Sequence, residues 1–228
     1  SGTPFTGTVT GTIDLPATLT DGTYTIVRAV VDKADNTSAP LSLVVLLDRT
    51  PPPITATPDL NLWYNITPVT ATFTAIDTGS GVAAGSPVPQ QAVRETEGIH
   101  EINCVAYDKI GNRSEARFYL RIDLSKPAFA GPGTIFPGAI VNGANTINQR
   151  TITVINPITD TYSGAKYIKL TVFNSSGITV TQTTLSLLDG SPLSGTIRGT
   201  VTLPDSLPDG TYSFSLVLYD RAGNYSVP

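Results

Sequence analysis

A long internal repeat constrains this fold more than any other feature of the sequence. A shift of 188 positions places Leu15-Pro16 on Leu203-Pro204, and Asp21-Gly22-Thr23-Tyr24 on Asp209-Gly210-Thr211-Tyr212, with no gap. The same shift brings Asp32, Ala34, Asn36, Ser38 and Pro40 onto Asp220, Ala222, Asn224, Ser226 and Pro228. Such periodicity predicts an array of similar units.

Two motifs define the parts of a unit. The ending motif has a weaker third copy 76 positions after the first, in which Glu97-Gly98, Asp108, Asn112 and Ser114 repeat Asp21-Gly22, Asp32, Asn36 and Ser38. An opening motif occurs twice, as Asp77-Thr78-Gly79-Ser80-Gly81 and as Asp160-Thr161-Tyr162-Ser163-Gly164. We therefore expect each complete unit to run from an opening half to an ending half.

Proline-rich joints at Arg49–Pro53 and Leu124–Pro127 divide the chain into three predicted domains. Residues 1–49 are the C-terminal half of a domain, residues 50–124 a complete short domain, and residues 125–228 a longer domain that lacks its last strand. We expect the chain to be a segment of a longer array. The open edge of the last domain would accept a strand equivalent to 41–47, from the continuing chain or from a neighbour.

Composition and periodicity both indicate an all-β fold. Gly 20 and Pro 18 disfavour helices, while alternation of period two predicts strands at 24–26, 69–76, 168–172 and 212–218. Turn pairs such as Asp21-Gly22, Asn142-Gly143 and Asp189-Gly190 recur between them. This pattern predicts tandem antiparallel β-sandwiches. One parity of the ending-half strands should face the core: Tyr24, Ile26 and Val30; His100, Ile102, Cys104 and Ala106; Tyr212, Phe214, Leu216 and Leu218.

Several function classes are disfavoured. A net charge of −4 provides no basic surface for nucleic acid, and one Cys with one His supports neither an internal disulfide nor a Cys/His zinc site. The sequence has no apolar run long enough for a membrane span. We assign no catalytic, cofactor-binding or metal-ligating residues and no cofactor, and expect no enzymatic activity.

The motifs resemble a known family. Trp63-Tyr64-Asn65, Pro68-Val69-Thr70, Asp77 with Gly79-Ser80-Gly81-Val82, Glu97-Gly98, and Asp108 with Gly111-Asn112 are similar to the bacterial immunoglobulin-like repeats found in tandem on large secreted and surface proteins. Unit one departs from the pattern with Asp35 in place of the Gly, and unit two is shortened between Ala84 and Arg94. The resemblance implies tandem immunoglobulin-like domains, an extracellular or cell-surface location, and a spacer, stalk, fibre or adhesive role.

The repeated acidic residues allow two interpretations. The pairs Asp32/Asn36, Asp108/Asn112 and Asp220/Asn224 could offer oxygens to calcium, most plausibly at the joints near Asp48 and Asp123. The same spacing is what a tight turn requires, because Asp accepts hydrogen bonds from local amides while Gly and Asn tolerate positive φ. The turn interpretation is favoured.

Other candidate residues have plain structural interpretations. Glycan acceptor patterns begin at Asn36, Asn65, Asn112, Asn174 and Asn224, three of them within the repeated turn. We expect His100 to pack at the core or its rim and Cys104 to lie in the core. Trp63 could stack on a sugar but is expected to anchor a sandwich edge. A Lys–Asn crosslink at Lys166 or Lys169 has no positive support.

These observations favour a structural repeat module of an extracellular filament, stalk or surface layer, in which short proline-bearing linkers give a semi-rigid string. Its expected partners are proteins, through self-association or neighbouring repeats. The alternative is an adhesin or a carbohydrate-binding accessory module of a secreted protein, with a glycan as partner. An exposed aromatic row would favour that alternative, and Trp63-Tyr64 are the adjacent pair the sequence offers.

Overall fold

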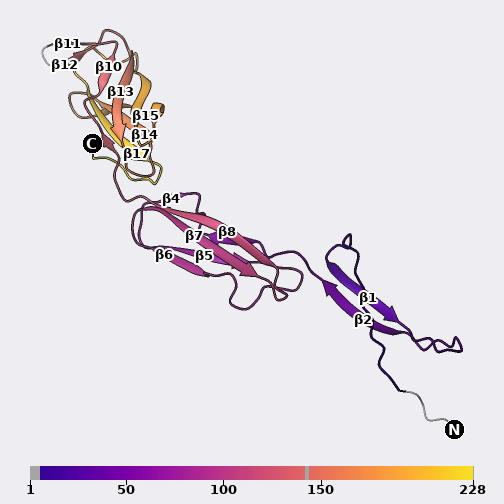
Figure 1. Ribbon diagram of the computed structural model, residues 1–228. Helices are drawn as coiled ribbons and strands as arrows, with labels where there is room; N and C mark the ends of the chain where they lie inside the picture. Colours follow the sequence, from indigo (N-terminus) through magenta and orange to yellow (C-terminus); the bar gives the residue numbers. More distant parts are fainter. Residues whose placement is uncertain (1–5, 142–143, 228) are drawn as a thin grey trace.

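The strands form three successive groups along the chain. The computed structural model describes residues 6–141 and 144–227, and this part contains strands and turns but no helix, hence none that could cross a bilayer. The predicted Asn142-Gly143 turn and Pro228 lie outside the described residues. Figure 1 shows the groups following one another from the amino end to the carboxyl end.

The first group is a two-stranded hairpin. β1 (Gly22–Arg28) pairs antiparallel with β2 (Leu41–Leu47), with Gly22 opposite Leu47, which confirms the strands predicted there. Tyr24 and Ile26 are half-buried, as their parity predicts. The expectation that Val30 faces a core is wrong, because Val30 lies beyond β1 and is 61% exposed, and within residues 6–49 the hairpin forms a sheet of two strands.

The second group is a sandwich of two three-stranded sheets. One sheet has the order β3 (Ile54–Thr57), β5 (Val69–Ala75), β6 (Gln91–Arg94). The other has the order β4 (Trp63–Tyr64), β8 (Arg113–Ile122), β7 (Gly98–Tyr107). Neighbouring strands are antiparallel, as predicted, except that β4 and β8 run parallel, with Trp63 opposite Arg121.

The core of this sandwich follows the predicted parity of β7. Ile102, Cys104 and Ala106 are buried, whereas the residues between them face outward or are half-buried. Ile102 and Cys104 belong to one apolar cluster with residues of β5 and β8, including Phe73 and Leu120. Burial of these side chains supplies the main favourable free energy of the domain.

The third group is larger, and its longest strand, β15 (Thr179–Ser191), pairs with different neighbours along its length. Its strands are β9 (Ala128–Phe129), β10 (Thr134–Phe136), β11 (Ala139–Val141), β12 (Ala144–Thr146), β13 (Thr151–Thr159), β14 (Ala165–Phe173), β15 (Thr179–Ser191), β16 (Ser194–Thr202) and β17 (Ser213–Asp220). The main path is β10-β13-β16-β15-β14-β17, with β9 also on β13 and β11-β12 as a separate hairpin. β15 pairs with β14 along its first part and with β16 along its last, with an irregularity between Leu187 and Asp189.

The last strand of the third group lies at the edge of its sheet in the described part of the chain. β17 ends the path of paired strands, with β14 as its partner, and on its other side Tyr219 forms a bridge with Tyr225 and the Ser226 N–H donates to the Leu218 oxygen. In the first two groups the equivalent strands, β1 and β7, pair with the strand that follows the ending motif. No strand of the described residues pairs across positions 49/50 or 124/125, and the domain boundaries given above remain predictions.

Candidate functional site at the domain joints

The ending motif forms the same turn in all three copies. In the second copy, the Asp108 carboxylate accepts hydrogen bonds from the backbone N–H groups of Ile110, Gly111 and Asn112, and from the Asn112 side-chain amide. Asp32 and Asp220 are bonded in the same way to Asn36 and Asn224. This is the turn chemistry that the sequence predicts.

The same Asn side chains also form hydrogen bonds with the backbone of the segment that leads into the domain. Asn112 Nδ2 donates to the backbone oxygen of Asp48 at 3.0 Å, and Asn224 Nδ2 donates to that of Asp123 at 2.8 Å. Asp48 directly follows β2, and Asp123 directly follows β8. The ending turn of one domain therefore holds the residue where the preceding domain's last strand stops, a contact that sequence reasoning missed.

The opening motif donates hydrogen bonds to the carboxylates of the same joint residues. The Ser80 N–H donates to Asp48 Oδ2 at 2.6 Å, and the Ser163 N–H donates to Asp123 Oδ2 at 2.8 Å. Gly79 leaves room for this contact, because a Cβ at that position would overlap the Asp48 carboxyl group. Opening and ending motifs thus meet at the joint in both domains.

The preceding domain contacts each joint with an acidic side chain. Thr50 Oγ1 donates to Asp21 Oδ2 at 2.5 Å, and Ser125 Oγ donates to Glu97 Oε2 at 3.0 Å. Asp21 and Glu97 occupy equivalent positions of the ending motif. Both joints are therefore hydrogen-bonded to the domains on either side.

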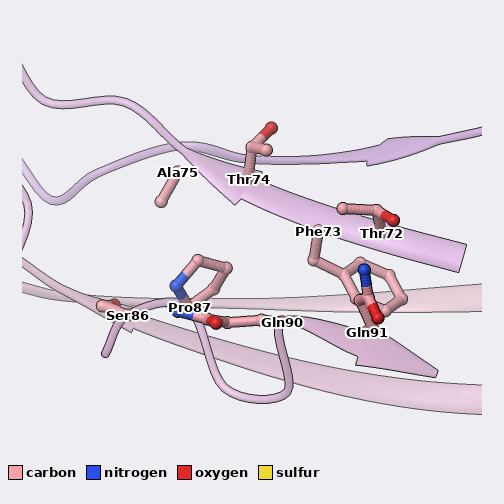
Figure 2. A pocket seen from close by; sticks show the side chains of 8 residues that line it. All are labelled: Thr72, Phe73, Thr74, Ala75, Ser86, Pro87, Gln90 and Gln91. Carbon is pink, nitrogen blue, oxygen red and sulfur yellow. The ribbon is translucent and has the colours of Figure 1, made fainter. Parts of the chain in front are cut away.

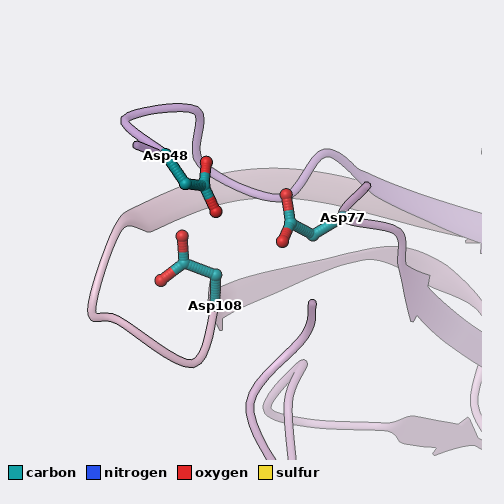
Figure 3. A group of neighbouring side chains, drawn as sticks. All are labelled: Asp48, Asp77 and Asp108. Carbon is teal, nitrogen blue, oxygen red and sulfur yellow. The ribbon is translucent and has the colours of Figure 1, made fainter. Parts of the chain in front are cut away.

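Each joint brings three carboxylates together. Asp48, Asp77 and Asp108 have carboxylate oxygens within 4.8 Å of one another, and so do Asp123, Asp160 and Asp220. Figure 3 shows the first set: Asp48 comes from the joint, Asp77 from the loop after β5, and Asp108 from the end of β7, and their carboxyl groups converge. The sequence suggested oxygens for calcium near Asp48 and Asp123, but not the participation of Asp77 and Asp160.

The two clusters differ in burial and charge. Asp77 is half-buried, whereas Asp123, Asp160 and Asp220 are all buried. Burial raises the pKa of Asp160 and of Asp220 above the usual value for Asp, and the nearby Asp123 carboxylate acts in the same direction. Burial also acts to raise the pKa of Asp108, but hydrogen bonds from Asn112, Gly111 and Ile110 outweigh it and lower the pKa.

His100 and Cys104 have structural surroundings. His100 Nε2 lies 2.8 Å from the backbone oxygen of Thr96, four residues earlier. Tyr24 and Tyr212, its counterparts in the other copies, donate to the backbone oxygens of Thr20 and Pro208 in the same way. Cys104 is fully buried, and burial raises the pKa of its thiol. These contacts fit the packing roles expected from the sequence.

The remaining candidate residues lie at or near the surface. Trp63 and Tyr64 are half-buried, and Tyr64 packs against the core and donates to the backbone oxygen of Asp59. Lys166 and Lys169 are exposed on β14. The side-chain amides of Asn36, Asn112 and Asn224 are hydrogen-bonded within the repeated turn, which leaves the acceptor patterns there explained by turn chemistry.

A pocket of about 430 Å³ lies elsewhere in the second domain. It is lined by Thr72, Phe73, Thr74, Ala75, Ser86, Pro87, Gln90 and Gln91, and Figure 2 shows these residues on β5 and on the segment that leads into β6. The lining contains neither a carboxylate nor a cation, and its aromatic ring, Phe73, is buried in the core. The arrangement offers no group for acid–base chemistry.

Comparison with known proteins identifies one domain. Residues 125–227 match the family model of the bacterial Ig-like domain. No curated protein matches the chain. Among solved structures, one of carbohydrate-binding modules from the β-sandwich superfamily has a TM-score of 0.31 at 11% identity and covers 79% of this chain and 100% of its own. Dimeric latent PorU from Porphyromonas gingivalis has a TM-score of 0.27 at 14% identity, covering 89% of this chain and 23% of its own.

Both TM-scores are too low to carry an argument, so the assignment rests on the family match. The matched residues cover the third predicted domain, whereas most of the motif residues that suggested the resemblance lie in the second. The second domain is similar to the matched one at its joint, where Asn112 and Asn224 make equivalent hydrogen bonds. The fold is all-β, and residues 125–227 match the family model of the bacterial Ig-like domain.

Proposed function

We propose that this chain is a spacer segment of an extracellular filament, stalk or surface layer, in which immunoglobulin-like domains follow one another through stiffened joints. One observation carries the proposal: both joints use the same hydrogen bonds to the domain before and the domain after. A flexible linker would need no such contacts. A repeated, doubly anchored joint restricts the angle between neighbouring domains, which is what a projecting structure requires.

The joint is suited to this role because nearby residues of the joint form hydrogen bonds with the preceding domain and with the following domain. Asp123 offers its backbone oxygen to Asn224 and its carboxylate to Ser163, both in the following domain. Two residues later, Ser125 offers its hydroxyl to Glu97 of the preceding domain. Three hydrogen bonds within three residues leave little backbone freedom, and the proline that follows, Pro127, fixes a further φ.

Small-angle X-ray scattering of the chain tests the proposal. We expect an elongated particle, and we expect Thr50→Val with Ser125→Ala to broaden its distribution of maximum dimensions, because these changes remove the hydroxyl donors to Asp21 and Glu97. Thr184→Val, an exposed strand residue away from both joints, is the control. A compact particle from the unaltered chain would overturn the proposal, as would a double variant indistinguishable from the control.

A further inference from the structure

The carboxylate cluster of the third domain is both buried and unneutralised. Asp123, Asp160 and Asp220 are 0%, 8% and 1% exposed, and their oxygens lie within 4.8 Å of one another. No ion pair in the described part of the chain reaches any of the three. Three like charges removed from water at this separation repel one another and lose their hydration, so a compensating positive charge is required.

Hydrogen bonds satisfy two of these carboxylates but leave the third incomplete. Both oxygens of Asp123 accept backbone N–H groups, from Ser125 and Ser163. Both oxygens of Asp220 accept hydrogen bonds from the ending turn. Asp160 Oδ2 accepts the Gly164 N–H at 2.5 Å, but Asp160 Oδ1 is buried with no hydrogen-bond partner. A buried polar atom without a partner is costly and calls for a ligand.

The second domain provides an internal comparison. Its Asp77, the counterpart of Asp160, is half-buried, and both of its carboxylate oxygens accept N–H groups, from Gly79 and Gly81. The shared turn therefore does not by itself produce an unpartnered oxygen. In the third domain the equivalent Tyr162 N–H acts on the Asp160 carboxylate but makes no hydrogen bond of ordinary geometry with Oδ1, which stays unpartnered in a more buried setting.

The donor set selects the kind of ligand. The converging groups are carboxylate oxygens, which are hard donors that suit calcium or magnesium and not the softer metals. Calcium accepts several carboxylates in flexible geometry, whereas magnesium usually keeps several waters and binds through one or two carboxylates. Three carboxylates that converge in a buried site therefore suit calcium better.

We propose that Asp123, Asp160 and Asp220 together bind a calcium ion, with the unpartnered Asp160 Oδ1 as one ligand atom. This departs from the interpretation that these residues serve turns alone. The ion would join the joint residue Asp123 to the opening and ending motifs of the third domain. The proposal stands on the buried cluster itself and does not depend on the spacer role.

Isothermal titration of the chelator-treated chain with calcium chloride tests the site. We expect one equivalent to bind with a dissociation constant of about 10⁻³ M or tighter, the range of extracellular modules, and the thermal unfolding of the third domain to shift upward. Asp160→Asn should weaken binding at least tenfold and abolish that shift. In the metal-free state the same variant should unfold at the same or a higher temperature, because it removes an uncompensated buried charge.

Asp77→Asn, the equivalent change in the second domain, is the matched control and should leave the calcium effect on the third domain unaltered. Asp160→Ser provides a second variant if Asp160→Asn does not fold. No heat and no shift up to about 10 mM calcium, roughly tenfold beyond the weakest expected affinity, would overturn the proposal. Binding that survives Asp160→Asn or is lost with Asp77→Asn would also overturn it. A compact shape in scattering leaves these readouts untouched, so the two proposals fail separately.

Discussion

At the scale of single residues, the ending turn depends on one position with positive φ. That position is Gly111 and Gly223 in two copies, with φ of 100° and 96°, and Asp35 in the other, with φ of 61°. Asp is among the few non-glycine residues that adopt this region. The sequence comparison identified Asp35 as a departure from the pattern, and the backbone shows why this departure is tolerated.

We therefore expect Gly223→Ala to destabilise the third domain by about 1–2 kcal/mol, since an L-residue with a Cβ is strained in the left-handed region. Gly223→Asp should cost less, as Asp35 indicates. Gly210→Ala is the control, because its added Cβ would meet nothing closer than 4.0 Å and its φ is not positive. Urea unfolding followed by circular dichroism measures the differences, and equal losses for Gly223→Ala and Gly210→Ala would contradict the argument.

The carboxylate of Asp108 should make the second domain sensitive to acid. Its pKa in the folded state is lower than the usual 3.8, because hydrogen bonds from Asn112, Gly111 and Ile110 outweigh the opposing effect of burial. The stability it contributes is complete above that usual value and is lost as the pH falls through the lowered pKa.

Trp63, the single Trp of the chain, lies in this domain and reports its unfolding. We expect the urea midpoint from Trp63 fluorescence to fall between about pH 5 and pH 2, and to fall less in Asp108→Asn, which has no carboxylate to protonate. Asp59→Asn, an acidic-to-neutral change at an exposed loop position outside the joint, is the control. Parallel curves for the unaltered chain and Asp108→Asn would show that Asp108 does not contribute to the pH dependence.

The local hydrogen bonds of the ending turn could be predicted from the sequence, but the contacts across the joints could not. The bonds from Asp108 to Asn112 are local, so spacing alone indicates them. Asn112 reaches Asp48 from 64 positions away, and Asn224 reaches Asp123 from 101. Contacts of this kind depend on how opening and ending loops meet in space, and no periodicity within a strand encodes that.

At the scale of elements, the long alternating strands were predictable and the short ones were not. β1, β5, β14 and β17 lie where alternation of polar and apolar residues places them, and β2 lies where the apolar segment after the ending motif predicts a last strand. β4 and β9 have two residues each, too few to show any period. β15 pairs first with β14 and then with β16, and this change of partner depends on where those two strands lie, which the residues of β15 alone do not show.

The position of β17 at the edge of its sheet leads to a prediction at this scale. Residues 41–49 correspond, after the shift of 188, to positions that would directly follow Pro228. A chain extended at Pro228 by a copy of residues 41–49 should be more stable in its third domain, by about 2 kcal/mol, since pairing on β17 buries further apolar side chains.

Hydrogen exchange of the β17 amides measures this effect. The control extension carries Ser in place of the copies of Val45 and Leu47, whose parity in β2 is the less exposed one. If both extensions slow the exchange equally, or if neither does, the added segment does not pair as a core-facing strand.

At the scale of the whole molecule, the repeat predicted the architecture better than it predicted a site. A period of 188 residues and shared motifs indicated similar domains in sequence, and the family match to residues 125–227 agrees with this for the third. The burial of Asp160 and the unpartnered oxygen of its carboxylate depend on how the third domain packs. The second domain has the same opening motif but does not bury the equivalent residue to the same extent.

The direct passage of β8 into the joint determines how the second domain would respond to tension. β8 ends at Ile122, the residue before Asp123, and its ten residues pair with ten residues of β7. A pull on the third domain acts along the length of β8, in a direction that slides it past β7. All ten pairs would then resist in shear together, instead of opening one at a time as in an unzipped hairpin.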